Sequence, residues 1–532
     1  MRIEAVDLLR GQLTLTNRYT FSDLSHLTAA WFLEADGAIL QSGHLPLPHA
    51  APGETVALAL PLAQPALRAN TDYWLTVRLT LAHDAPWAAQ GHEVAWQQFK
   101  IPYDVPQGIP LDPGSFTPVQ FHEDARGIRI NGDNFALHFD AESGRLTSLQ
   151  LAGQELIQSG PAFNIWRAPT DNDANTWGDQ RMAMRWRDAG LDRLIEQVDG
   201  VTAAHTSDGA VEVRVRAASV PDPTSAPQAS EEWQGMLQSM GRMLPYFFND
   251  EQLRQLTLKL GYNYDDIPGA GNEPKAENLV SALVNDGRLP QMIDVLYDAL
   301  SALHDDIPAQ ALERVTQLRG LSMEQIRAAF NTGAATRFDH ETVYTIYGSG
   351  DIVIEQTVAP SGNLPPLPRL GLTLTLPPGF EQFTWYGRGP FESYADRKLS
   401  ARMDVHSGTV DEQYTPYIMP QENGNKTDVQ WAALTNENGA GLLITGAQPI
   451  NVSAHHFTAQ ELTAARHTHE LQRREEVILN VDYAQGGLGN GSCGPGVLPQ
   501  YLFAPGPVKW RLRLRPFHAN QESAITLSKE RI

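Results

Sequence analysis

The 532-residue chain has one cysteine, few basic residues and no long apolar run. Because Cys493 is alone, an internal disulfide is excluded, which fits a reducing cytosol and predicts a cytoplasmic location. Forty Lys and Arg against 62 Asp and Glu give a net charge of −22, which argues against nucleic acid or an anionic membrane as a partner. No apolar run approaches the ~20 residues of a membrane span. Glu4 and Asp7 interrupt the segment where a secretion signal would need an apolar core.

Short stretches of alternating apolar and polar residues dominate what is present. In residues 1–103 they include GQLTLTNRY, TAAWFLEAD and DYWLTVRLTL, separated by glycine-containing turns. Strands at this spacing predict an N-terminal β-sandwich of the immunoglobulin type. We expect its tryptophans to lie in the core and seams of that domain; they are Trp31, Trp74, Trp87 and Trp96. Residues 104–122 are rich in proline and glycine, which predicts a linker.

Residues 123–223 and 336–532 carry the same short-strand pattern, as in NFALHFD, LTSLQLAG, LGLTLTLP and VILNVDY. Turn dipeptides such as Asn131-Gly132 predict successive hairpins of one large antiparallel sheet. The segment QRMAMRWRDAGL, residues 180–191, is an exception, because its apolar residues indicate a short helix with a packing role.

Between these two parts the hydrophobic period changes from two to about 3.6 residues, which predicts an inserted all-α bundle at residues 224–335. Asn249 followed by Gln252 is a capping pattern for its first helix. The predicted helices begin near Asn249, Pro274, Met292 and Ser322. Since strand character resumes afterwards, the insertion falls in a loop of a β-domain. The predicted fold class is mainly β with this helical insert.

The most distinctive segment is residues 385–424, which reads WYGRGPFESYADRK and then YTPYIMPQENGN after a gap. Its glycines and prolines predict a chain path that is neither helix nor regular strand. Its aromatic residues stand among carboxylates, amides and a guanidinium, a mixture that suits a sugar, because apolar sugar faces stack on rings and hydroxyls need polar partners. In the alternative interpretation, Glu392 and Arg397 pair with each other inside a buried loop.

Three other segments carry polar side chains of possible function. Arg167 and the aspartates of FNIWRAPTDND either bind hydroxyls or fix a loop, and nothing nearby has the His or Cys spacing of a metal site. His467 and His469 would share one face if they lay on a strand, and they are interpreted as solvated or hydrogen-bonded and not as metal ligands. The loop GGLGNGSCGPG lacks the lysine and following helix of a phosphate-binding loop, which argues against a nucleotide. No metal or cofactor is predicted on this chain.

These segments together resemble the C-terminal portion of the large β-galactosidases of glycoside hydrolase family two. The resemblance is carried by FNIWRAPTDND, WYGRGPFESYADRK, YTPYIMPQENG, ELTAARHTHEL and VDYAQGGLGNGSCGP, which occur in the family's order. Residues 1–103 likewise resemble the immunoglobulin-type domain that precedes this portion. For residues 123–223 and 336–532 the resemblance implies an antiparallel supersandwich similar to galactose mutarotase, known as the small-chain domain.

The resemblance also implies what is missing. Family members hydrolyse β-galactosides with two glutamates on a (β/α)8 barrel, which needs ~250 residues of alternating strand and helix. This sequence has no such run, so no catalytic residue is assigned. The chain is expected to be the C-terminal portion or small subunit of a β-galactosidase, inactive by itself, that lines the active site of a barrel-bearing chain. Two alternatives stay open: a non-catalytic carbohydrate-binding protein, and an adaptor acting through its helical insert.

Residues that match the family motifs are candidates for carbohydrate binding or for the domain interface. They are Asp171, Asp173, Glu392, Asp396, Arg397, Glu422, Asn423 and Cys493. In the family a loop of the small-chain domain reaches the active site, and GLGNGSCGPG is the matching segment here. Some members have a tryptophan where this chain has Cys493, and a thiol cannot stack on a sugar ring.

The insert has a resemblance of its own. The stretch YFFNDEQLRQLTLKLGYNYDDIPG and the NDGRLPQMI junction are similar to bacterial effector-associated, death-like domains, which are small helical bundles that pair with one another. This resemblance implies a docking module with a death-like partner. The alternative is an insertion that only packs on its host domain.

Overall fold

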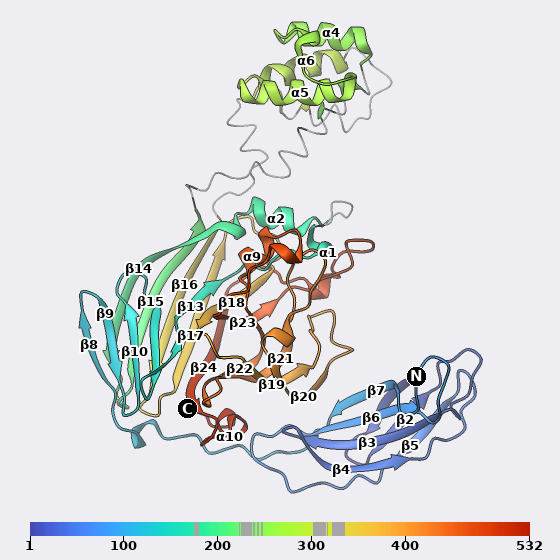
Figure 1. The fold of residues 1–532 in the computed structure, drawn as a ribbon, viewed down its shortest axis with the longest axis vertical. Helices are drawn as coiled ribbons and strands as arrows, with labels where there is room; N and C mark the ends of the chain where they lie inside the picture. Colours follow the sequence, from blue (N-terminus) through green and yellow to red (C-terminus); the bar gives the residue numbers. More distant parts are fainter. Residues whose placement is uncertain are drawn as a thin grey trace.

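The computed structural model describes residues 1–174, 180–222, 248–301 and 336–531, with a few isolated positions between 224 and 321. The fold is mainly β, as predicted (Figure 1). Its described strands form four sheets, and every pairing between them is antiparallel. Among the helices of the described residues, none is both long enough and apolar enough to cross a membrane.

The first 100 residues form two sheets that share one core. The strand orders are β1-β2-β5 and β4-β3-β6-β7. The strands are β1 (Arg2–Asp7), β2 (Gln12–Thr16), β3 (Leu27–Ala35), β4 (Ala38–Leu45), β5 (Thr55–Ala59), β6 (Trp74–Leu81) and β7 (Glu93–Lys100). Because successive side chains of a strand point to opposite faces, alternate residues such as Trp31 and Leu33 of β3 are buried between the sheets with Leu75 and Val77 of β6.

The other tryptophans of this domain lie outside that core. The Trp74 indole donates a hydrogen bond to Tyr386 Oη at 2.8 Å, and the Arg402 guanidinium lies 4.8 Å from the Trp96 ring centre, so both rings belong to the seam with the rest of the chain. Trp87 is 63% exposed, and its predicted core or seam position is wrong. It lies in the turn between β6 and β7, beyond the ends of both strands.

The remaining strands build one large domain from two further sheets. One has the order β12-β11-β10-β9-β8, and the other has β13-β18-β23-β22-β24-β17-β16-β15-β14 with β19, β20 and β21 joined to it through β22. The first group is β8 (Gln120–Asp124), β9 (Gly127–Asn131), β10 (Phe135–Asp140), β11 (Leu146–Leu151) and β12 (Gln154–Ile157). The second group is β13 (Ser159–Asn164), β14 (Leu194–His205), β15 (Val211–Pro221), β16 (Arg337–Ile346), β17 (Ile352–Ser361), β18 (Arg369–Leu376), β19 (Gln382–Gly389), β20 (Arg402–Thr409), β21 (Lys426–Thr435), β22 (Ala440–His455), β23 (Val477–Gln485) and β24 (Val508–His518).

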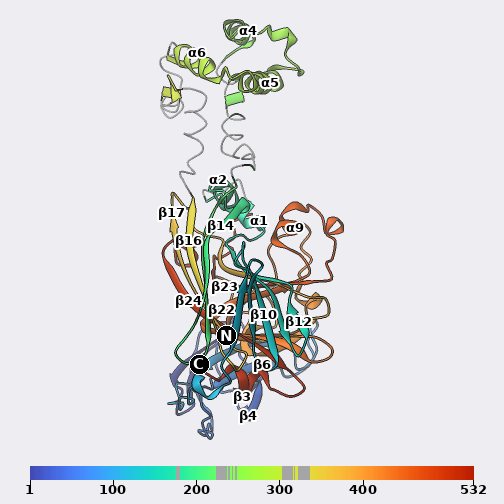
Figure 2. The same ribbon diagram turned by 90° about the vertical axis from the view of Figure 1, so that its left-hand side faces the viewer.

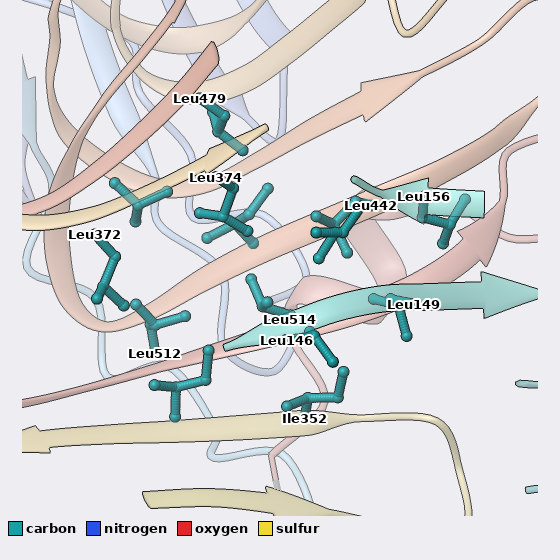
Figure 3. Close-up of a cluster of buried hydrophobic side chains, with 14 of the residues drawn as sticks. Leu146, Leu149, Leu156, Ile352, Leu372, Leu374, Leu442, Leu479, Leu512 and Leu514 are labelled. Atoms are coloured by element: carbon teal, nitrogen blue, oxygen red, sulfur yellow. The ribbon is translucent and has the colours of Figure 1, made fainter. Parts of the chain in front are cut away.

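The two sheets of this domain pack through a continuous apolar core. Figure 3 shows Leu146 and Leu149 of β11 among Leu442, Leu512 and Leu514 of the large sheet. All five side chains are almost fully buried. Burial of branched side chains from both sheets stabilises the sandwich and leaves its strand ends and loops to carry polar residues.

Two boundaries differ from the sequence predictions. Strand β8 begins at Gln120, inside the segment predicted as a linker. Strand β19 continues through Gly389 and pairs with β20 and β21, so the prediction of an irregular path over this part of the chain is wrong. The reason is close packing: a side chain at Gly387 would meet the Val429 backbone at 2.9 Å, and one at Gly389 would meet the His406 ring at 2.6 Å.

Residues 222–336 are inserted between two neighbouring strands, because β15 pairs with β16 from Val211↔Ile346 to Ser219↔Phe338. The described residues of this stretch form three longer helices, which lie together in Figures 1 and 2. They are α4 (Asp250–Lys259), α5 (Asn272–Asn285) and α6 (Leu289–Ser301). They share an apolar core, and Asn249 and Gln252 form the predicted capping box of α4. The helix predicted after Ser322 falls outside the described residues.

The C-terminal tail ties the first domain to the large one. After helix α10 (Ala524–Ser528), Lys529 Nζ bonds Asp36 and donates to Thr71 Oγ1 at 2.7 Å, while Asn70 Nδ2 donates to the Lys529 carbonyl at 2.9 Å. Arg513 of β24 in turn donates to a carbonyl of α10. A cavity of about 1070 Å³ lies at this seam between the two domains.

Candidate functional site

The segments singled out in the sequence meet around the glycine-rich loop, residues 486–497, which follows β23. Asp396 accepts backbone N–H bonds from Leu488 at 3.0 Å and from Gly489 at 2.8 Å. Arg397, on the same turn, donates to the Gly489 carbonyl. Since these loop amides have no strand partner, the carboxylate satisfies donors that would otherwise need water. Asp396 and Arg397 therefore hold the loop in place.

A buried ion pair holds the start of the same loop. Arg167 Nη2 lies 2.8 Å from Asp173 Oδ1, and both side chains are 1% exposed. Arg167 also donates to the carbonyls of Gly486 at 2.7 Å and Gly487 at 3.2 Å. Asp173, in helix α1 (Asp171–Ala174), accepts from the Thr170 backbone N–H at 2.9 Å. Of the two predicted roles for this segment, fixing a loop is the one that Arg167 and Asp173 perform.

Two further contacts to the loop were not predicted from the sequence. Asn172 accepts from the Ser492 N–H at 3.0 Å and donates to the Gly489 carbonyl at 2.8 Å. Gln180 brackets Val497, accepting from its N–H at 2.7 Å and donating to its carbonyl at 2.8 Å. Asn172 stands inside the TDND motif and could have been found there, whereas Gln180 carries no local signal of its role.

Glu392 organises a second loop, residues 414–424. Its carboxylate accepts from the Gly424 N–H at 2.7 Å and from the Tyr417 hydroxyl. Burial, reinforced by the negative charge of Glu392, raises the pKa of Tyr417. Gly424 has a φ of +72°, and a side chain there would meet the Gln413 carbonyl at 2.6 Å, so glycine is required. The bonds of Glu392 run to this loop and those of Arg397 to the glycine-rich loop, in place of the pairing that the sequence left open.

Glu422 and Asn423 lie in the interior and are not available to a ligand. They are 5% and 1% exposed. Glu422 faces Arg369 at 3.5 Å and accepts from Gln485 at 3.1 Å, and the same guanidinium donates to Asp482 at 2.7 Å. Burial raises the pKa of Asp482 to about 6, although the charge of Arg369 opposes that rise. This cluster fixes the end of the 414–424 loop against β18 and β23.

The aromatic residues predicted as a sugar platform differ in exposure; they are Trp385, Tyr386, Phe391, Tyr394, Tyr414 and Tyr417, and Tyr414 is half-buried. Trp385, Tyr386 and Tyr394 are at most 5% exposed, so the prediction that they face a sugar is wrong. Trp385 and Tyr386 are adjacent on β19 and point to opposite faces, where Trp385 enters the core of the sandwich and Tyr386 packs in a second apolar cluster with Trp431. Phe391 and Tyr417 remain at the surface. Among the predicted polar residues, Asp171, Arg397 and Cys493 are exposed.

Several large apolar side chains are exposed on the 414–424 loop and on the segments that flank Glu392, Arg397 and the glycine-rich loop. We call them the apolar rim; they are Phe391, Leu399, Tyr417, Ile418, Met419 and Leu498. Leu399 and Ile418 are 95% and 89% exposed, which is unusual for such large apolar residues.

Lys426 is a buried cation beneath this region. It is 2% exposed, donates to the Pro390 carbonyl at 3.1 Å and lies 5.0 Å from the centre of the Trp385 ring. Burial lowers its pKa to about 8. Desolvation of the ammonium therefore outweighs the single carbonyl bond and the ring contact.

Lys426→Met is expected to raise the free energy of unfolding at neutral pH by about 1–3 kcal/mol. A fall of the pKa from 10.5 to about 8 means that burial disfavours the charged form by about 3 kcal/mol. The variant avoids this cost but loses the hydrogen bond to the Pro390 carbonyl, which reduces the gain in stability by about 1 kcal/mol. Between about pH 8 and 10.5 the unfolded chain keeps a proton that the folded chain has released, so wild-type stability should rise with pH across this window. Thermal denaturation from pH 7 to 10.5 should show that rise in the wild type and not in the variant.

Lys509→Met is the matched control, because Lys509 is 63% exposed and pairs with Glu355 at the surface. It should change neither the stability at pH 7 nor its slope with pH. A Lys426→Met variant that keeps the wild-type slope would show that another group titrates in this window.

Two histidines before the ELTAARHTHEL segment are hydrogen-bonded. The buried His455 donates to the Asn423 carbonyl at 2.8 Å, and His456 donates to the Glu476 carbonyl at 3.0 Å. His467 and His469 do not lie on a strand. A capping box starts the short helix α9 (Ala459–Ala464), and the chain then makes a single 3₁₀ turn, Thr468–Glu470.

Comparison with known proteins gives consistent matches. The family model described as beta galactosidase small chain matches residues 131–242 and 285–514, and the one described as beta-galactosidase, domain 4 matches residues 13–102. The beta-galactosidase of Priestia megaterium is 28% identical over 486 residues, covering 91% of this chain and 35% of the relative. The beta-galactosidases of Photobacterium profundum and an Arthrobacter species are 25% and 26% identical, with 96% and 94% of this chain and 39% of each relative covered. The chain thus spans well under half the length of these relatives.

Proposed function

This chain belongs to the beta galactosidase small chain family and corresponds to the C-terminal portion of β-galactosidases. From this premise we propose that it supports and lines an active site that a barrel-bearing chain completes. In this proposal the substrate is a β-galactoside, and the bond-breaking glutamates lie on the (β/α)8 barrel. The chain by itself hydrolyses no galactoside and needs no cofactor for this role. Its single cysteine agrees with action in the cytoplasm.

The proposal rests on one observation: polar residues of the motifs bond to the backbone of a loop. Asp396, Arg397, Asn172 and the Arg167–Asp173 pair all fix one glycine-rich loop by bonds to its backbone. A retaining glycosidase needs two carboxyl groups about 5 Å apart in an open cleft. Here the carboxylates of these motifs are occupied in holding loops, an arrangement that suits the wall of a cavity better than a reaction centre.

The apolar rim supports a large protein partner beside this loop. Its side chains stand on segments whose positions are fixed by Glu392, Arg397 and Gln180. A preformed apolar surface loses little conformational freedom on association. The barrel-bearing chain is the occupant that the family relationship favours, with the exposed side chains of Asp171, Arg397 and Cys493 placed near the shared cavity. Since a thiol cannot stack on a ring, other groups would hold the leaving sugar.

The proposal also assigns each domain of the chain to a fold type. The two sheets of the first domain, with three and four strands, agree with an immunoglobulin-type sandwich. The large domain agrees with the mutarotase-like supersandwich. For α4, α5 and α6 we propose a death-like docking module, supported by their own apolar core and by their insertion between β15 and β16.

The test is an assay with a chromogenic β-galactoside. The chain is measured alone and mixed with a Priestia megaterium beta-galactosidase shortened by the part that matches this chain. Activity only in the mixture is expected. Hydrolysis by the chain alone would contradict the proposal. Sugar binding without rescue would favour a carbohydrate-binding protein.

A second variant separates the helical insert from this role. Joining Pro221 to Arg337 by a two-residue hairpin turn removes the insert, because β15 and β16 already pair. Rescue should survive this deletion, and self-association through the insert should not. Self-association that depends on the insert, without any rescue of activity, would favour an adaptor that acts through its helices.

A further inference from the structure

The 3₁₀ turn after α9 carries three side chains with metal-binding atoms that the proposed function does not use. They are His467, His469 and Glu470. Each offers one donor atom, and these atoms lie within 4.8 Å of one another. We propose that they bind a divalent transition-metal ion such as Zn²⁺. The sequence supplied only the two histidines; the turn adds the carboxylate.

The three groups are already arranged side by side. The two imidazole rings stack with centres 5.3 Å apart and planes 21° apart. His467 Nδ1 lies 2.8 Å from Glu470 Oε1, and the other Glu470 oxygen accepts from the Arg466 N–H at 2.8 Å. One oxygen is thus anchored while the other faces the rings.

Only small movements of the three side chains are needed to bring their donor atoms to the spacing of a metal site. Zinc bonds to imidazole and carboxylate of about 2.0–2.2 Å place the donors of a tetrahedral site roughly 3.3 Å apart. Both histidines and Glu470 are exposed, so their side chains can rotate without disturbing a core. Helix α9, which precedes these residues, is anchored to the rest of the domain, because Thr463 accepts a hydrogen bond from the Trp166 indole and Leu462 is buried.

The donor set defines the class of ion. Two imidazoles and one carboxylate suit Zn²⁺, Ni²⁺ or Cu²⁺, whereas Mg²⁺ and Ca²⁺ prefer oxygen ligands. Three protein ligands leave a fourth position for water.

A second cluster in the described part of the chain shows the contrast. Glu381, Asp411 and His456 also gather their donor atoms, but Arg473 already lies among them. Its Nη2 is 2.9 Å from His456 Nε2 and 3.0 Å from Asp411 Oδ2. A guanidinium therefore supplies the positive charge there. At the other cluster, by contrast, the ion pair that Glu470 makes within the described residues is with His467 and not with an arginine.

Isothermal titration calorimetry with ZnCl₂ tests the site. The full chain, free of any histidine tag and dialysed against a chelator, carries Cys493→Ser to remove the exposed thiol. We expect saturable binding with a Kd in the micromolar range or tighter, unaffected by excess MgCl₂. The single variants His469→Ala and Glu470→Gln should each weaken binding at least tenfold.

The matched control is His49→Ala, an exposed histidine 3.8 Å from the carboxylate of Asp23 and far from this turn in sequence. It should leave the Kd unchanged. Absence of saturable Zn²⁺ binding would overturn the proposal. So would a double variant of His467 and His469 that binds as the parent does. The readout is independent of galactoside hydrolysis, so it succeeds or fails separately from the proposed function.

Discussion

Replacing Arg369 by methionine is expected to lower the free energy of unfolding by about 3–5 kcal/mol. Arg369 begins β18, is fully buried, and lies between Asp482 at 2.7 Å and Glu422 at 3.5 Å. Methionine fills the same space but leaves two buried carboxylates without a cation, which is the costly way to break a buried ion cluster. Denaturant unfolding followed by tryptophan fluorescence measures the loss.

The pH dependence of this loss identifies its cause. Asp482 has a folded pKa of about 6 against 3.8 in the unfolded chain, so protonation favours the folded state as the pH falls through 6. Without the positive charge of Arg369, the folded-state pKa of Asp482 should rise further. The deficit of Arg369→Met should therefore be smaller at pH 5 than at pH 8. A deficit independent of pH would indicate lost packing and not an unpaired charge.

Arg337→Met is the control for this experiment. Arg337 pairs with Asp339 at 2.8 Å, but both side chains are solvent-exposed on β16. Exposed pairs contribute little because water and salt screen them. The unfolding curve of this variant should match the wild type, and an equal loss in both variants would contradict the special role of burial.

Asp396→Ala is expected to reduce rescued β-galactosidase activity roughly 10- to 100-fold while leaving global stability nearly unchanged. The carboxylate accepts from Leu488 and Gly489, and no other described side chain accepts from these two amides. Without it the glycine-rich loop can relax, and small displacements of a cavity wall carry rate losses of this size. The measurements are kcat/KM of the mixture and hydrogen exchange at the two amides, which should accelerate.

Asp339→Ala serves as the control, because Asp339 is an exposed carboxylate of the same domain whose only side-chain bond within the described part of the chain is to Arg337 on its own strand. Neither rescue nor loop exchange should change. If Asp396→Ala speeds amide exchange but leaves rescue intact, the loop is held as described and does not line the active site.

Several local features were predictable because neighbouring residues determine them. The alternation in β3 and β6 marked buried strands, since the side-chain period of a strand is two residues. The capping box at Asn249 and Gln252 was predicted and is present, because it depends on residues three apart.

The candidate site shows where such reasoning stops. Asp171 and Asp173 are two residues apart in one motif, yet one is exposed and the other is 2% exposed against Arg167. Trp385 and Phe391 belong to one aromatic segment, yet only Phe391 is at the surface. A motif names residue types, whereas burial depends on strands that lie elsewhere in the chain.

The sequence alone established that this protein is a mainly β chain with a helical stretch between two strand-rich parts. It also carried the motifs of the β-galactosidase C-terminal portion. Only the tertiary structure decided that these motifs converge on one loop, because Arg167 meets Gly486 across 319 positions and Asp396 meets Gly489 across 93. Hydrophobic periodicity acts within a few residues, while the partner of a buried charge is selected by how whole sheets pack.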